Sequence, residues 1–125
     1  MHALVIDDSR AMRKVLSKIL GDLGFSVVEA GNGQEALERM QSEAVDLALI
    51  DWNMPVMNGY EFLQAVRAQP SWADVRLMMV TTETGIEEMT KALAAGADEY
   101  VMKPFTKSDL VSKLGLMGFR REATP

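Results

Sequence analysis

Chemically reactive side chains follow three short apolar segments of the chain. Asp7 and Asp8 follow the first segment, Asp51 follows the second and Lys103 follows the third. If the segments are neighbouring strands of a parallel sheet, their carboxyl ends lie together at the edge where such sheets bind ligands. Three acids and one lysine are therefore expected to share a site.

The residue types in this group indicate phosphoryl chemistry. Three carboxylates at one site repel one another, and a cation together with the lysine would compensate that repulsion. Mg²⁺ prefers oxygen ligands and is commonly held by one or two carboxylates and a phosphate. The ammonium of Lys103 and the hydroxyl of Thr81 are suited to phosphoryl oxygens. Because a carboxylate can attack a phosphoryl group and form an aspartyl phosphate, the pattern predicts a pocket for phosphoryl transfer.

Each of these residues also has an ordinary structural explanation. Asp8 or Ser9 would cap a helix that starts next. Asp51 would be a turn residue, since asparagine and proline follow it closely. Lys103 would be a solvated surface lysine. Any one residue fits either explanation, and their joint occurrence at the ends of apolar segments favours the shared site.

Composition limits both the size of the fold and its chemistry. A chain of 125 residues suits one domain. The absence of cysteine excludes disulfides and thiol chemistry, and with His2 as the single histidine a metal would have to be held by oxygen. The net charge of -5 disfavours binding to a phosphate backbone, so no nucleic-acid partner is expected.

The sequence has no signal-type segment at its start and no apolar run long enough to span a bilayer. We therefore expect a soluble cytoplasmic protein without a membrane partner, and a monomer.

Short apolar segments alternate with longer segments of helical period, which predicts one doubly wound α/β domain with a parallel sheet of five strands and helices on both faces. In the first helix Val15 is expected on the apolar side and Arg13 on the opposite, polar side. Gly24 is expected to end that helix. The predicted strands are residues 3–6, 26–30, 47–50, 76–81 and 99–102, and the predicted helices are residues 10–23, 34–41, 59–68, 86–95 and 107–116.

Six motifs follow one another along the chain: Val5-Ile6-Asp7-Asp8-Ser9, Ile50-Asp51-Trp52-Asn53-Met54-Pro55, Asn58-Gly59, Val80-Thr81, Ala95-Gly96-Ala97 and Tyr100-Val101-Met102-Lys103-Pro104-Phe105. This ordered set closely resembles bacterial response-regulator receiver domains, and among these the stand-alone chemotaxis regulators. The resemblance covers nearly the whole chain, and it implies a flavodoxin-like (βα)5 fold with strand order 2-1-3-4-5. It also implies a receiver domain over residues 1–118 and a short tail over residues 119–125.

The resemblance implies a role for each acid. Asp51 would be the phosphoacceptor, phosphorylated by a histidine kinase. Asp8 and Asp51 would bind Mg²⁺ directly, together with the main-chain carbonyl of Asn53, and Asp7 would act through water. Lys103 would contact the phosphoryl group.

The same resemblance implies a conformational switch and a limited signal lifetime. Thr81 would move toward the phosphorylated aspartate and Tyr100 would turn inward. Asn53 and Glu83 would tune self-dephosphorylation, which is expected to be quick. The downstream target would be a protein, with the flagellar motor switch as a candidate. The peptide bond before Pro104 would be cis, as in the family.

Three other functions are consistent with parts of the pattern. A phosphorelay shuttle or another stand-alone regulator would use the same site. An aspartyl-phosphate phosphohydrolase usually has a second acid two residues after its nucleophile, and Asn53 occupies that position here. A flavin-binding flavodoxin-like protein needs a phosphate-binding first loop, which Asp7 and Asp8 would repel. The leading interpretation is a phospho-switch that is not a conventional enzyme and catalyses only its own phosphoryl transfer and dephosphorylation.

Overall fold

A computed structural model describes residues 1–82 and 86–119, without the side chain of Ile86, and strands alternate with helices along these ranges. The predicted strands and helices are all present, with bounds that differ by at most one residue at either end. A 3-10 helix over residues 70–72 was not predicted. In chain order the elements are β1 (His2–Ile6), α1 (Arg10–Asp22), β2 (Ser26–Ala30), α2 (Gly33–Ser42), β3 (Leu47–Ile50), α3 (Gly59–Arg67), η1 (Pro70–Trp72), β4 (Arg76–Thr81), α4 (Ile86–Ala94), β5 (Glu99–Met102) and α5 (Lys107–Leu116).

The strands form one parallel sheet with the order β2-β1-β3-β4-β5, which confirms the predicted flavodoxin-like topology. Because every pair is parallel, the carboxyl ends of all five strands lie along one edge of the sheet. The order reverses direction beside β1, where β2 lies on one side and β3 on the other. Ligands in such folds bind at this switch point, so the topology places Asp7, Asp8 and Asp51 where a site is expected.

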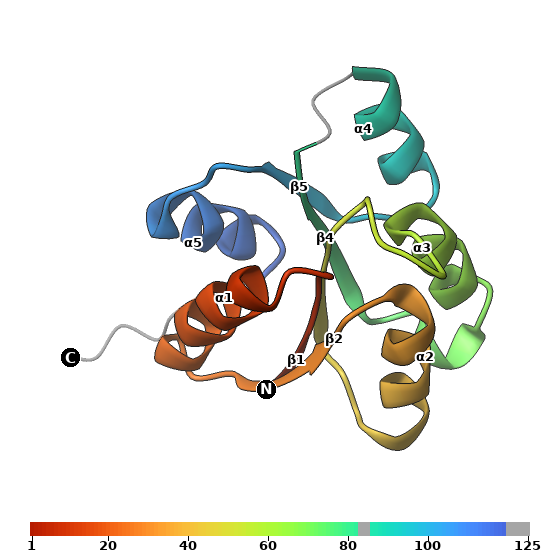
Figure 1. The fold of residues 1–125 in the computed structure, drawn as a ribbon, viewed down its shortest axis with the longest axis horizontal. Coiled ribbons are helices and arrows are strands. Elements are labelled where there is room, and N and C mark those ends of the chain that lie inside the picture. The colour runs from red at the N-terminus through yellow and green to blue at the C-terminus, as the bar shows by residue number, and fades with distance from the viewer. Residues whose placement is uncertain (83–85, 120–125) are drawn as a thin grey trace.

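Helices cover both faces of the sheet: α1 and α5 lie on one face, and α2, α3 and α4 lie on the other (Figure 1). Each face has its own apolar core. Leu16, Leu20, Leu110 and Leu114 pack on the first face, and Phe62, the largest fully buried side chain, packs on the second. None of the helices in the described ranges has the length and apolar character that crossing a bilayer would require.

Helix α1 differs from the predicted orientation. Val15 is 49% exposed, although it was expected on the apolar side. Arg13 was expected on the solvent side, but its side chain is 19% exposed. Arg13 lies three residues before Leu16 and seven before Leu20, so helical geometry places all three on the stripe that faces the sheet. The arginine stem can cover apolar surface there while its guanidinium reaches polar groups at the end of β1.

Candidate functional site

Backbone hydrogen bonds extend the sheet one residue beyond the strands that carry the site. The N–H of Asp7 donates to β2 at 3.1 Å, that of Asp51 donates to β1 at 2.9 Å, and that of Lys103 donates to β4 at 2.8 Å. These residues are therefore fixed by the same ladder that builds the sheet, and their side chains project from its carboxyl edge.

The three acids meet at this edge. One carboxylate oxygen from each of Asp7, Asp8 and Asp51 lies within 4.8 Å of the others. Asp7 and Asp51 are buried, at 1% and 8% exposure, whereas Asp8 is exposed. An all-oxygen donor set of this size, open to water on one side, fits Mg²⁺, which retains several waters when it binds carboxylates.

Lys103 is the cation that enters this group of acids. Its Nζ lies 2.7 Å from Oδ2 of Asp7 and 3.8 Å from Oδ2 of Asp51. The other oxygen of Asp7 accepts a hydrogen bond from the N–H of Ser9 at 2.8 Å. Both oxygens of Asp7 are thus engaged by the protein, which distinguishes this acid from the exposed Asp8.

Ser9, not Asp8, caps helix α1. The Ser9 hydroxyl accepts a hydrogen bond from the N–H of Met12 at 3.2 Å. The capping explanation for Asp8 is therefore wrong, since the serine already satisfies that part of the helix end.

The electrostatics of Asp51 follow from its position among these charges. Burial raises the pKa of the Asp51 carboxyl above its ordinary value. Lys103 lowers that pKa, Asp7 and Asp8 raise it, and a hydrogen bond from the Thr81 side chain lowers it, with a net upward shift. The site therefore disfavours the ionised form of Asp51, and a bound cation would stabilise that form.

A glycine allows the loop that follows Asp51 to pack on helix α3. A Cβ on Gly59 would lie 2.3 Å from the main-chain oxygen of Asp51, so no other residue fits without movement of the backbone. Its N–H also donates to the carbonyl of Trp52 at 2.9 Å. Asn58 and Glu61 form a reciprocal capping box that starts the helix at this point. The main chain after Asp51 is therefore held against the first turn of α3.

The other predicted site residues are placed as follows. Thr81 is fully buried at the end of β4, and Tyr100 is buried in the core shared with α2, α3 and α4, at 4% exposure. The side chain of Asn53 is exposed on the loop that follows Asp51. Glu83 lies outside the described residues. The structure thus brings Thr81 and Lys103 to the three acids, and the peptide bond from Lys103 to Pro104 is cis, as the resemblance implied.

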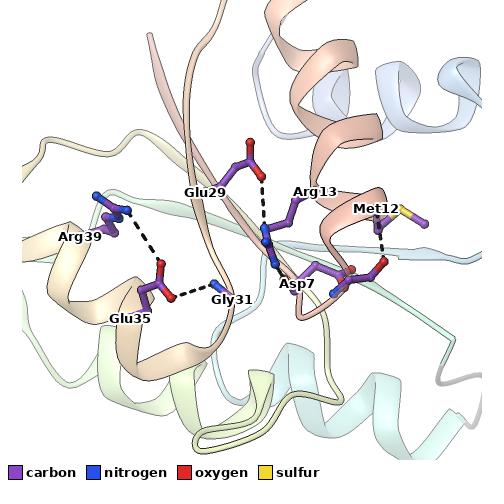
Figure 2. A network of polar contacts seen from close by, with 8 residues as sticks. Asp7, Met12, Arg13, Glu29, Gly31, Glu35 and Arg39 are labelled. Carbon is purple, nitrogen blue, oxygen red and sulfur yellow. Dashed lines mark hydrogen bonds and ion pairs between the residues drawn. The ribbon is translucent and has the colours of Figure 1, made fainter.

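Arg13 contacts this site, although the sequence pattern placed it in solvent (Figure 2). Its Nη1 donates to the main-chain carbonyl of Asp7 at 2.6 Å, and its Nε donates to Oε1 of Glu29 at 3.2 Å. Two sequence features could have indicated this contact. Glu29 is an acid that follows two valines within a strand, and Arg13 shares the helical stripe of Leu16.

Comparisons with known proteins agree with this geometry. The family model described as the response regulator receiver domain matches residues 3–115. The chain is 43% identical over 116 residues to the chemotaxis protein CheY1 of Helicobacter pylori, covering 91% of this chain and 94% of that protein. It is 44% identical over 116 residues to a chemotaxis protein CheY homolog of Campylobacter jejuni, covering 91% and 89% of the two chains.

A solved structure shares both the fold and part of the sequence. The chemotaxis response regulator CheY4 of Vibrio cholerae superposes with a TM-score of 0.87 at 38% identity, over 93% of this chain and 97% of that one. The family match covers the region that holds the three acids, the threonine and the lysine. This chain belongs to the response regulator receiver domain family.

Proposed function

We propose that this protein is a two-component response regulator that is switched by phosphorylation of Asp51 by a histidine kinase. The gathering of three carboxylates within 4.8 Å at the carboxyl edge of the sheet, with Lys103 3.8 Å from Asp51, is the observation that carries the proposal. Membership of a signalling family supports it.

Each side chain of the site has a part in this transfer. A carboxylate oxygen of Asp51 bonds to the phosphorus as the donor group leaves, and an aspartyl phosphate results. Lys103 contacts one phosphoryl oxygen as a point charge, and the Thr81 hydroxyl donates to another. Positioning and charge stabilisation account for catalysis of this kind, and the protein supplies both from the edge of its sheet.

Mg²⁺ is the cofactor that this site would hold. Asp8 and Asp51 would bind it through their carboxylates, and Asn53 through its main-chain carbonyl. The indirect role proposed for Asp7 is supported by its two oxygens, which already accept hydrogen bonds from Lys103 and from the N–H of Ser9. When bound, the metal neutralises negative charge that develops on the phosphoryl oxygens.

The proposed output is a conformational change that a protein partner recognises. Thr81 and Tyr100 are the proposed switch residues, because a threonine that contacts Asp51 and a tyrosine buried on the neighbouring strand can respond together to a new phosphoryl group. A few kcal/mol of differential contact is enough to shift such an equilibrium.

Control of the flagellar motor in chemotaxis is the proposed biological role. The relatives and the solved structure named above are chemotaxis proteins. The proposal includes a cytoplasmic monomer with its receiver domain over residues 1–118, and it expects the signal to end by self-dephosphorylation tuned by Asn53 and Glu83.

A phosphorylation assay on purified protein tests this proposal. Wild type, Asp51→Asn and the matched control Asp22→Asn are incubated with phosphoramidate and Mg²⁺, and intact mass is followed over time. Asp22 is exposed on α1, and its Oδ2 lies 3.9 Å from Nζ of Lys107. Replacing it therefore makes the same change from aspartate to asparagine at a position away from the site. We expect wild type and Asp22→Asn to gain one phosphoryl group, and Asp51→Asn to gain none while its circular dichroism is unchanged.

Two results would contradict the proposal. Phosphorylation of Asp51→Asn at the wild-type rate would exclude Asp51 as the acceptor. Once the donor is removed, a phosphorylated form that persists for hours in Mg²⁺ buffer would exclude quick self-dephosphorylation.

A further inference from the structure

The peptide units on both sides of Asp8 are held by specific hydrogen bonds. In the unit before Asp8, the Asp7 carbonyl accepts from Arg13 at 2.6 Å, and the preceding unit is tied to β2 by the Asp7 N–H at 3.1 Å. On the other side, the N–H of Ser9 donates to the Asp7 carboxylate at 2.8 Å. The carboxylate of Asp8 itself is exposed, so its position depends on the main chain that carries it.

Arg13 is well placed to fix this main chain because it is itself held at two points (Figure 2). The guanidinium donates to the carbonyl of Asp7, directly after β1, and to Glu29 on β2, and the Arg13 side chain is 19% exposed. The planar fork of an arginine can make both bonds at once, which a flexible point charge cannot do equally well. The arginine therefore ties α1 to the ends of two strands beside the acids.

The charge of Arg13 and its geometry would have opposite effects on metal binding. A positive charge beside three acids repels a cation, so the charge alone weakens Mg²⁺ binding, although Glu29 offsets part of it. A fixed peptide holds Asp8 near Asp51 and so strengthens binding. The two roles can be separated by the direction in which affinity changes when the guanidinium is removed.

We propose that Arg13 is a positioning residue that orients the peptide between Asp7 and Asp8 and thereby raises the Mg²⁺ affinity of the site. This inference rests on the proposed function, because it takes Asp8 as a metal ligand. Residues that hold metal ligands in place typically change affinity by about 10- to 100-fold when they are replaced.

Titration calorimetry with MgCl₂ measures the affinity directly, and Trp52 fluorescence follows the same titration. The test variant is Arg13→Met, which removes the guanidinium and keeps an unbranched stem. Lys14→Met is the matched control, since Lys14 is exposed and its loss removes one charge from the next position of the helix. We expect Arg13→Met to bind Mg²⁺ about 10-fold more weakly than wild type. Lys14→Met should bind as wild type does or slightly more tightly.

Arg13→Lys separates positioning from general stability. A lysine can donate to the Asp7 carbonyl but lacks the fork that also reaches Glu29, so we expect an affinity between those of wild type and Arg13→Met. Urea unfolding in metal-free buffer shows which variants are folded. If Arg13→Met does not fold, Arg13→Lys decides: weaker Mg²⁺ binding supports the proposal, and wild-type affinity overturns it.

The outcomes distinguish this inference from the function on which it rests. Mg²⁺ binding by Arg13→Met that equals or exceeds that of wild type overturns the positioning role and leaves the proposed function intact. Absence of Mg²⁺ binding by wild type contradicts the metal site itself, and with it both proposals.

Discussion

The two edges of the sheet use oppositely charged pairs in different ways. At the amino edge, beside the start of β5, Nη2 of Arg67 donates to Oδ2 of Asp98 at 2.9 Å, and the N–H of Leu77 donates to the same oxygen at 2.8 Å. The Nε of Arg67 donates to the carbonyl of Gly96 at 3.0 Å. Arg67 and Asp98 there satisfy each other and the backbone around them, and Nη1 of Arg76 lies 3.9 Å from the other oxygen of Asp98.

The carboxyl edge is not balanced in this way. Lys103 faces three acids, and its short contact of 2.7 Å is with Asp7, while Asp51 lies 3.8 Å away. Burial and the neighbouring acids raise the pKa of Asp51. The contrast indicates that the charges at the amino edge stabilise the fold. At the carboxyl edge the acids still repel one another, and binding of a cation would relieve that repulsion.

The largest expected effect on stability is at the amino edge. Replacing Arg67 with alanine removes the charged donor of the Gly96 carbonyl and the close donor of Asp98, which keeps only Arg76 at 3.9 Å. The substitution should lower the free energy of unfolding by about 2 kcal/mol. Urea unfolding measures this change, and phosphorylation of the folded variant should be unaffected.

The matched control for this prediction is Arg39→Ala. Its guanidinium lies 3.9 Å from Glu35 in an exposed helical pair, and such pairs contribute about 0.3–0.5 kcal/mol. If both substitutions changed stability equally, the amino edge would have no special structural role.

A smaller effect of opposite sign is expected at the carboxyl edge. In metal-free buffer Asp8→Ala should raise the free energy of unfolding by up to about 1 kcal/mol, because it removes one like charge from an exposed position near Asp7 and Asp51. The same variant should lose both stabilisation by Mg²⁺ and phosphorylation. Glu38→Ala, at an exposed position of α2, controls for the loss of a negative charge. Lower stability of Asp8→Ala without metal would refute the repulsion.

The smallest effect is a dependence on pH. The pKa of Asp51 is raised in the folded protein. Between the ordinary pKa and the raised one, the carboxyl is therefore protonated in the folded state and ionised in the unfolded chain. The contribution of Asp51 to stability therefore rises as the pH falls from neutral through the raised pKa. In metal-free buffer the stability advantage of Asp51→Asn over wild type should be greatest near neutral pH and should shrink on acidification. If the stability difference between Asp51→Asn and wild type did not change with pH, the raised pKa of Asp51 would be contradicted.

The strands and helices could be predicted from the sequence because their signals are local, whereas the strand order came from the family resemblance. Strands buried on both faces are apolar along their whole length, as Leu47–Ile50 shows, and Gly24, with φ 96°, ends the first helix as expected. Helix η1 (Pro70–Trp72) was missed because three residues carry no periodicity.

The sequence predicted which residues form the site, but not which of them contact one another most closely. Strand ends specify which residues meet, since parallel strands align their carboxyl ends. Whether Lys103 approaches Asp7 more closely than Asp51 depends on side-chain rotamers and neighbouring backbone donors, which no spacing encodes. Arg13 was missed because it is a charged residue on a buried stripe, and its contact with the Asp7 carbonyl requires three elements to pack together.

Asp51 is proposed to accept the phosphoryl group, and chemical trapping of the phosphorylated residue tests this role directly. Wild-type protein is phosphorylated with phosphoramidate and Mg²⁺ and treated with borohydride, which reduces an aspartyl phosphate to homoserine, and the modified residue is located by peptide mass spectrometry. We expect homoserine at position 51 and an unmodified aspartate at positions 7 and 8. Homoserine at another position, or at none while the protein carries a phosphoryl group, would contradict it.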